Sequence, residues 1–126
     1  MRGNVINGLE AVASIEVLAP DLGHVKVLAI IDTGCTCDLT LPTSAIRDLG
    51  LPLLRLERAT LADDSTITVE IYQGSVVWLG QIRNIEVVQT EGTPLLGMHL
   101  MQNCRLTIDI VPDGEFEIIS LEEIQE

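Results

Sequence analysis

Short stretches in which apolar and polar residues alternate dominate this sequence and constrain its fold more than any other feature. In one such stretch, Leu9, Ala11, Ala13, Ile15 and Val17 alternate with mostly polar neighbours, and a period of two predicts a half-buried strand. Glycine, proline and aspartate separate these stretches and supply turns. We therefore expect a mainly β fold with about eight or nine short strands and two small helices, closed as a barrel or a sandwich.

Most of the remaining chain is predicted as strands and hairpins. The stretch 24–31 is apolar nearly throughout and rich in β-branched residues, which predicts a strand buried on both faces. Beyond it we expect a short strand at 38–42, a hairpin over 56–72 with its tip at 62–65, two strands around Gly80, and a last hairpin that turns at 112–114.

Two short helices are predicted between these strands. The first follows Pro42, with Thr43 or Ser44 as its N-cap and Gly50 as its C-terminal stop. The second is expected within residues 93–103. Both helices are short, so they do not change the mainly β class.

Length and composition limit the cellular setting and the partners. The 126 residues suit a single domain over 1–126, with a core at about 9–119 and an acidic C-terminal tail at 120–126. No apolar stretch approaches the ~18 residues of a membrane helix, and no signal peptide is recognisable, so we expect a cytoplasmic protein without a membrane partner. In that compartment the three cysteines are expected to be reduced thiols. The formal charge of -12 argues against nucleic acid as a partner.

The stretch AIIDTG, residues 29–34, places a carboxylate at the end of an apolar strand. Apolar neighbours limit hydration and disfavour the charged form, so Asp32 needs a partner or a chemical purpose. Taken alone, Asp-Thr-Gly also fits an aspartate that caps a turn. A second motif, PLLGMHLMQNCRLTIDI at 94–110, follows some sixty residues later, with an alternating stretch between the two.

These two motifs in this order resemble the retropepsin family, single-domain aspartic proteases that work as homodimers. The resemblance covers about residues 9–119 and is greatest to members encoded in bacterial chromosomes. It implies a closed retropepsin-like (acid protease) β-barrel with one or two short helices and a flap hairpin. It also implies an aspartic endopeptidase in which Asp32 is catalytic, Thr33 braces the active-site loop of the other subunit, and Gly34 lets the substrate backbone approach.

The same resemblance assigns substrate contacts to the flap at 61–68 and to one leucine. The expected contacts are Ala62, Asp63, Asp64, Ser65 and Leu95, whereas Leu96 is expected in the core. The family's flap is usually rich in glycine, so Asp64 is expected to adopt a positive φ, which aspartate tolerates better than most residues. Two such flaps carry four carboxylates, which predicts non-acidic peptide substrates and a slightly acidic pH optimum. No cofactor is expected.

A homodimer follows from the number of motifs. Aspartic proteolysis uses two carboxylates that share one proton, one acting as general base and the other as general acid. The chain contains one Asp-Thr-Gly, so the second carboxylate must come from a symmetric partner. The apolar strands at 106–111 and 116–119 would otherwise leave a sheet edge exposed, and pairing across the two-fold axis would cover them.

Two alternatives remain open at this point. One is a catalytically silent retropepsin-fold module that binds peptides or dimerises, which the unusual flap favours. The other is a metal site formed by Cys35, Cys37, Cys104 and His99, since three thiolates and an imidazole suit tetrahedral zinc. The Cys-x-Cys spacing is not usual for zinc, so no metal is expected. His99 also replaces an acidic residue often found in relatives, which argues against the family's buried charge pair.

Overall fold

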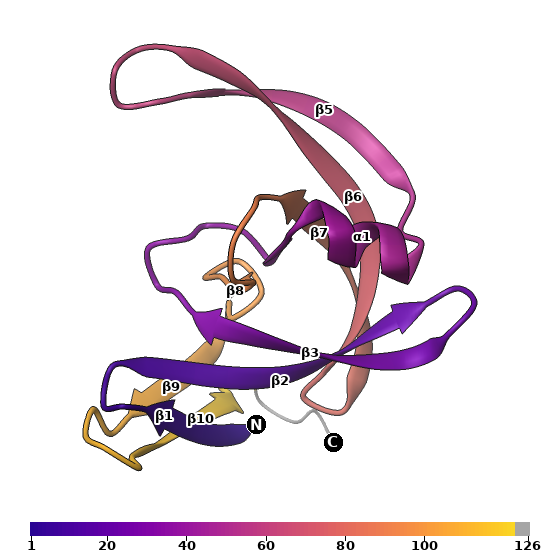
Figure 1. Cartoon of the computed structure of the whole chain (residues 1–126). Helices are drawn as coiled ribbons and strands as arrows, with labels where there is room; N and C mark the ends of the chain where they lie inside the picture. Colours follow the sequence, from indigo (N-terminus) through magenta and orange to yellow (C-terminus); the bar gives the residue numbers. More distant parts are fainter. Residues whose placement is uncertain (123–126) are drawn as a thin grey trace.

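The computed structural model describes residues 1–122, which form ten strands and one helix (Figure 1). The strands are β1 Arg2–Ile6, β2 Glu10–Ala19, β3 Gly23–Ile31, β4 Leu39–Leu41, β5 Leu53–Thr60, β6 Thr66–Trp78, β7 Gln81–Gln89, β8 Leu95–Leu96, β9 Cys104–Ile108 and β10 Glu115–Ser120. The helix, α1, spans Thr43–Leu49. Residues 123–126 of the predicted acidic tail lie outside the described residues. No helix within 1–122 is long and apolar enough to cross a bilayer.

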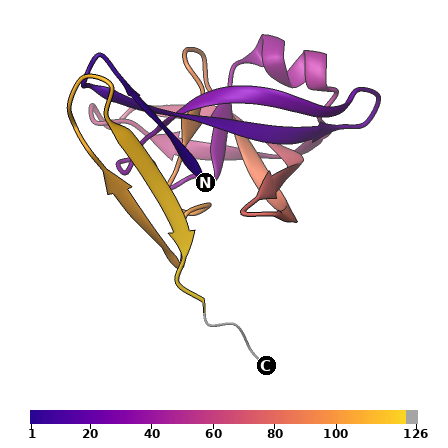
Figure 2. The ribbon, with the colours of Figure 1, turned by 90° about the horizontal axis from the view of Figure 1, so that it is seen from below.

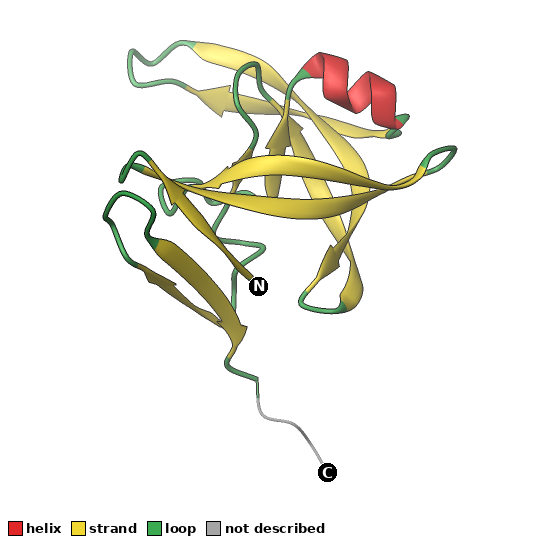
Figure 3. Cartoon of the chain, turned by 60° about the horizontal axis from the view of Figure 1, so that its bottom comes forward, coloured by secondary structure: helices red, strands yellow, loops and turns green. Residues whose placement is uncertain are grey.

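The strands close into a ring, which confirms the predicted barrel (Figure 3). Neighbouring strands follow the order β6-β7-β4-β8-β3-β2, and β2 pairs back onto β6 through Glu16↔Val77 and Val17↔Val76. β5 extends the sheet beyond β6, and β1, β10 and β9 extend it beyond β2. The β9–β10 hairpin flanks the barrel on the side away from α1 (Figure 2).

The core forms as the alternation predicts. In β2, the residues Ala11, Ala13, Ile15 and Val17 are buried, while Glu10 and Ser14 are exposed. Leu9, which the predicted pattern also includes, precedes the strand and is 83% exposed. Apolar side chains from the other ring strands complete the interior, among them Leu39, Leu41, Val76, Val87 and Leu96. The period-two pattern therefore identifies the inward face correctly, because successive strand residues point to opposite faces.

The prediction for β3 is wrong in one respect. Of its residues only Ala29 is fully buried, and Leu28 is 63% exposed. On one face of β3, His24, Lys26 and Leu28 are exposed, whereas Val25, Val27 and Ala29 on the other face are half-buried or buried. One face of β3 therefore meets solvent in the single chain, and an apolar run cannot by itself reveal which face is covered.

The predicted second helix at 93–103 does not form. Leu95 and Leu96 instead make β8, which lies between β3 and β4 and pairs with both. Turns follow, with the Gln102 N–H donating to the His99 carbonyl at 3.4 Å. The backbone pairing with two neighbouring strands overrides the local preference of this leucine-rich segment for helix.

Three smaller expectations also change. Pro42, and not Thr43 or Ser44, occupies the N-cap of α1, while Gly50 ends the helix in the left-handed conformation as predicted. The fold begins before residue 9, because β1 pairs with both β2 and β10. β10, which contains 116–119, therefore has neighbours on both sides, and β9 is an edge strand of the described sheet.

Candidate functional site

Asp32 lies immediately after β3, at the start of a loop that leads to β4. Its backbone N–H donates to the Leu96 carbonyl at 2.9 Å, which ties the loop to β8. Its Oδ1 accepts a hydrogen bond from the Gly34 N–H at 2.8 Å, and within residues 1–122 its Oδ2 has no hydrogen-bond partner. Asp32 is half-buried, whereas Thr33 and Gly34 are exposed. One carboxylate oxygen is thus held in place while the other is available to a water molecule.

The loop from Asp32 to Asp38 interlocks with the turn that follows β8. A Cβ atom at Gly97 would lie 2.7 Å from the Cys37 Sγ and closer still to the Cys37 carbonyl oxygen, so only glycine fits without movement. The backbone bonds between the two segments are Gly97 N–H to Asp38 O at 3.0 Å, Met98 N–H to Cys35 O at 2.8 Å, and His99 N–H to Cys37 O at 3.1 Å. The position of the loop therefore depends on this turn.

A carboxylate–imidazole pair strengthens the same junction. The Asp38 side chain is only 7% exposed, and its Oδ1 lies 2.6 Å from Nδ1 of His99, whose side chain is 57% exposed. Its Oδ2 accepts a hydrogen bond from the Glu86 backbone N–H at 3.0 Å. A buried carboxylate is thus paired with an exposed imidazole, and the expectation that the family's buried charge pair is missing stays a prediction. Asp38 was not among the predicted site residues, although a carboxylate beside the apolar residues of β4 is a recognisable signal.

The cysteines differ from the sequence prediction. Cys35 and Cys37 form a disulfide, whereas Cys104 is free. The two Cα atoms lie 5.4 Å apart, within the usual range for a disulfide. The prediction of reduced thiols is thus wrong for this pair, and so is the zinc alternative, because two of its ligands are bonded to each other. Within residues 1–122 no group of three His, Cys, Asp or Glu side chains could hold a metal ion.

The β5–β6 hairpin carries the predicted flap and extends beyond the barrel, on the same side as the loop that follows β3 (Figure 1). Its tip closes through the Leu61 N–H and the Ser65 carbonyl at 2.8 Å. Asp64 has φ 65°, which confirms the predicted positive φ. Hydrogen bonds from the Ser65 hydroxyl and backbone N–H hold the pKa of Asp63 below its usual value. Ala62 and the three residues after it are exposed.

Leu95 and Leu96 differ in burial as predicted. Leu96 is fully buried in the core, whereas Leu95 is half-buried and pairs with Ile30 two residues before Asp32. The fold therefore brings Leu95 to the Asp32 loop. The flap tip is not hydrogen-bonded to that loop in the described part of the chain.

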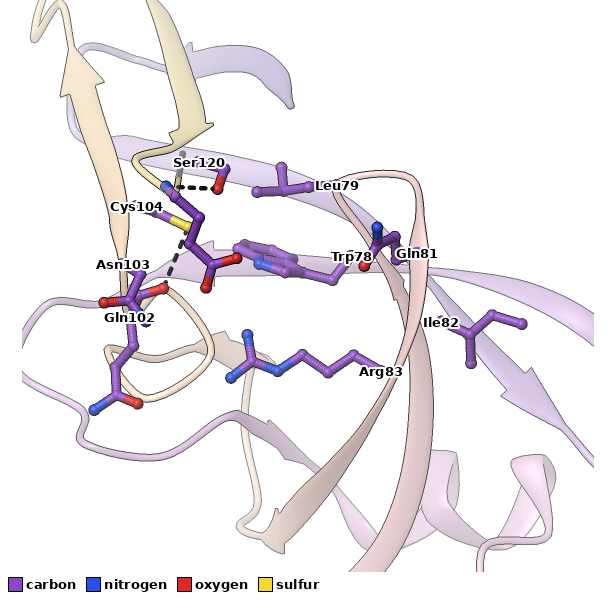
Figure 4. Close-up of a pocket in the computed structure, with 10 residues that line it drawn as sticks. Trp78, Leu79, Gln81, Ile82, Arg83, Gln102, Asn103, Cys104 and Ser120 are labelled. Atoms are coloured by element: carbon purple, nitrogen blue, oxygen red, sulfur yellow. Dashed lines mark hydrogen bonds between the residues drawn. The ribbon is translucent and has the colours of Figure 1, made fainter. Parts of the chain in front are cut away.

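A hollow of about 380 Å³ lies elsewhere, between the β6–β7 turn and the start of β9 (Figure 4). Its lining includes Trp78, Arg83 and Cys104, whose Sγ donates to the Gln102 carbonyl at 3.5 Å. None of the predicted catalytic or flap residues lines it. Cys104 is therefore separate from the Asp32 loop.

Neither a protein-family model nor a curated protein matches the chain. A solved structure, described as a retropepsin-like aspartic protease from Rickettsia conorii, is similar over 95% of both chains, with 20% sequence identity and a TM-score of 0.51. A likeness at this identity establishes the fold. The chain thus has a retropepsin-like fold over nearly its whole length.

Proposed function

We propose that this protein is an aspartic endopeptidase that hydrolyses peptide bonds as a homodimer. A water molecule is activated by two Asp32 carboxylates, one from each subunit. The observation that carries the proposal is the placement of Asp32 at the end of a strand of a retropepsin-like fold, on a loop held by backbone hydrogen bonds to β8 and to the turn after it.

The chemistry follows from bringing two such carboxylates together. Like charges at close range cannot both ionise, so the pair shares one proton at working pH. The ionised Asp32 removes a proton from the water, and the water oxygen attacks the peptide carbonyl carbon. The protonated Asp32 of the other subunit donates to the carbonyl oxygen, which gives a tetrahedral intermediate. Proton transfer to the leaving nitrogen then breaks the C–N bond.

The flap hairpin offers a surface for an extended peptide. Within residues 1–122, β5 has a neighbour on one side only, so its other backbone edge can pair with a substrate strand. Large apolar side chains are exposed along the hairpin, namely Leu53, Leu54, Leu56, Leu61 and Ile67. In this proposal Ala62, Asp63, Asp64 and Ser65 close over the substrate, and Leu95 lines a side-chain pocket. Apolar, non-acidic peptides suit this surface.

Exposed apolar residues at the opposite end of the sheet support self-association. Ile6 and Leu9 at the β1–β2 turn, and Ile110 and Val111 at the β9–β10 turn, are all exposed. The two turns are neighbours, because a Cβ atom at Gly8 would lie within 3.3 Å of atoms of Val111 and Pro112. Together with the edge of β9, which has no partner strand in the described part of the chain, this surface suits a second copy of the chain.

The first experiment compares the native chain with Asp32→Asn on a mixed peptide library across a pH series. Asparagine keeps the size of the side chain but cannot exchange a proton, so we expect cleavage to fall at least about 100-fold. Asp21→Asn, at an exposed turn, is a matched control that should cleave as the native chain does. A preparation shown to be dimeric that cleaves no peptide would refute the proposal and leave a catalytically silent peptide-binding or dimerisation module.

A further inference from the structure

The Cys35–Cys37 disulfide follows Gly34 directly and encloses a single residue, Thr36. The stabilisation that a disulfide provides by restricting the unfolded chain grows with the length of the loop it closes. A bridge across one residue therefore contributes little to the stability of the whole fold. Its effect is local, because it restricts the backbone between the two cysteines.

That short stretch of backbone supports the turn after β8. The Cys35 carbonyl accepts the Met98 N–H at 2.8 Å, and the Cys37 carbonyl accepts the His99 N–H at 3.1 Å. Gly97 packs directly against Cys37, including its Sγ atom. The closed disulfide restricts the spacing of these two carbonyls, because it joins the residues that carry them.

The turn after β8 is also connected to Asp32 by backbone hydrogen bonds. Gly97 directly follows Leu96, whose carbonyl accepts the Asp32 N–H at 2.9 Å. The Cys35 N–H also donates to the Asp32 carbonyl at 3.2 Å. The disulfide is therefore linked to Asp32 both through its own loop and through β8.

The disulfide is also accessible. Cys35 and Cys37 are half-buried, and the residues on either side of Cys35, Gly34 and Thr36, are exposed. Exchange with a disulfide requires that an attacking thiolate reach one of its sulfur atoms. A small thiol can approach this loop from solvent in the described chain.

We propose that Cys35 and Cys37 form a redox-controlled site that sets the geometry of the Asp32 loop. In the reaction with a dithiol reductant, its thiolate attacks one sulfur of the pair, and the Cys35–Cys37 bond breaks to give a mixed disulfide. The second thiol of the reductant then closes the reductant's own disulfide. The reductant has supplied two electrons and two protons, and the protein holds two thiols. An oxidised dithiol reverses the reaction.

The consequence is a change at Asp32. In the disulfide form the carbonyls of Cys35 and Cys37 hold the turn, and Asp32 is in the position described above. In the dithiol form the loop between them gains freedom and the bonds to Met98 and His99 weaken. The effect on peptide cleavage rests on the proposed function, whereas the change in the loop does not.

The test uses the full chain purified without reductant, before and after treatment with dithiothreitol. Thiol titration in denaturant should find one thiol before reduction and three after it, since Cys104 is free. Amide hydrogen exchange is then measured on peptides that contain Met98 and His99. We expect faster exchange there after reduction, and at least a tenfold loss of peptide cleavage, since a 1 Å misplacement in an active site can cost about 100-fold.

Two variants separate this site from other thiol effects. The double variant Cys35→Ser/Cys37→Ser should exchange and cleave as the reduced native chain does, and dithiothreitol should not change it. Cys104→Ser should respond to dithiothreitol as the native chain does. Unchanged exchange at Met98 and His99 after the thiol count has risen from one to three would overturn the proposal. The exchange measurement tests the redox proposal even if neither redox form cleaves peptides. Absence of cleavage in both forms would instead count against the proposed protease.

Discussion

Gly97→Ala tests whether the turn after β8 holds the Asp32 loop in place. The added Cβ atom would lie 2.7 Å from the Cys37 Sγ and 2.9 Å from the Cys37 carbonyl carbon. Both distances are shorter than a normal contact between such atoms, and most of the obstruction is backbone. The two segments must therefore move apart, and the hydrogen bonds between them lengthen or break.

The magnitude follows from those hydrogen bonds. Three backbone bonds join the turn to the loop, and each contributes about 1 kcal/mol net. Loss of two or all three lowers the free energy of unfolding by about 2–3 kcal/mol. Gly80→Ala is a suitable control because a Cβ atom there meets nothing within 4 Å, while its φ of 84° disfavours alanine. That control should lower the free energy of unfolding by only about 1 kcal/mol.

The assay is urea unfolding at one fixed chain concentration, followed by the fluorescence of Trp78. This is the single tryptophan of the chain, and it is 5% exposed, so its emission should change on unfolding. We expect Gly97→Ala to unfold at a clearly lower urea concentration than Gly80→Ala and to lose peptide cleavage as well. Equal midpoints for the two variants would refute the argument that the turn and the loop are interlocked.

Two further predictions concern charge. The double variant Asp63→Asn/Asp64→Asn removes negative charge from the flap. Cleavage of peptides that contain glutamate should then rise about two- to fivefold, the size expected for charges about 10 Å apart in water. Cleavage of neutral peptides should not change. Hydrogen bonds from Thr43 hold the pKa of Glu91 in the folded chain below its ordinary value of 4.5. Ionised Glu91 therefore stabilises the folded chain above pH 4.5. This stabilisation is lost as the pH falls through the lower pKa that Glu91 has in the folded chain. Glu91→Gln should therefore show a smaller fall in melting temperature between pH 7 and pH 3 than the native chain, and an equal fall would contradict this reasoning.

Elements that depend on local patterns could be predicted from the sequence. A few neighbouring residues are enough to predict the alternation in β2, the turn around Gly80 and the end of the helix at Gly50. The positive φ of Asp64 belongs to the same group, because a tight hairpin tip demands it locally. The retropepsin-like fold could be expected because its two motifs stand in the right order along the chain.

Features that depend on partners far away in the chain could not be predicted. Leu95 and Leu96 form a strand because β3 and β4 flank them, not because of their own preference. β1 forms because β2 and β10 offer hydrogen-bonding edges to Arg2–Ile6. In both cases the pairing partner lies outside the window that a local pattern covers.

For the candidate site, the sequence by itself determined which residue is proposed to be catalytic, since Asp32 stands out in an apolar context close to Gly34. Only the tertiary structure decided how that residue is held. The hydrogen bond from its N–H to Leu96, the burial of Asp38 against His99 and the close approach of Gly97 to Cys37 all join segments about sixty residues apart. Such contacts depend on the closure of the barrel, which brings β3, β4 and β8 side by side.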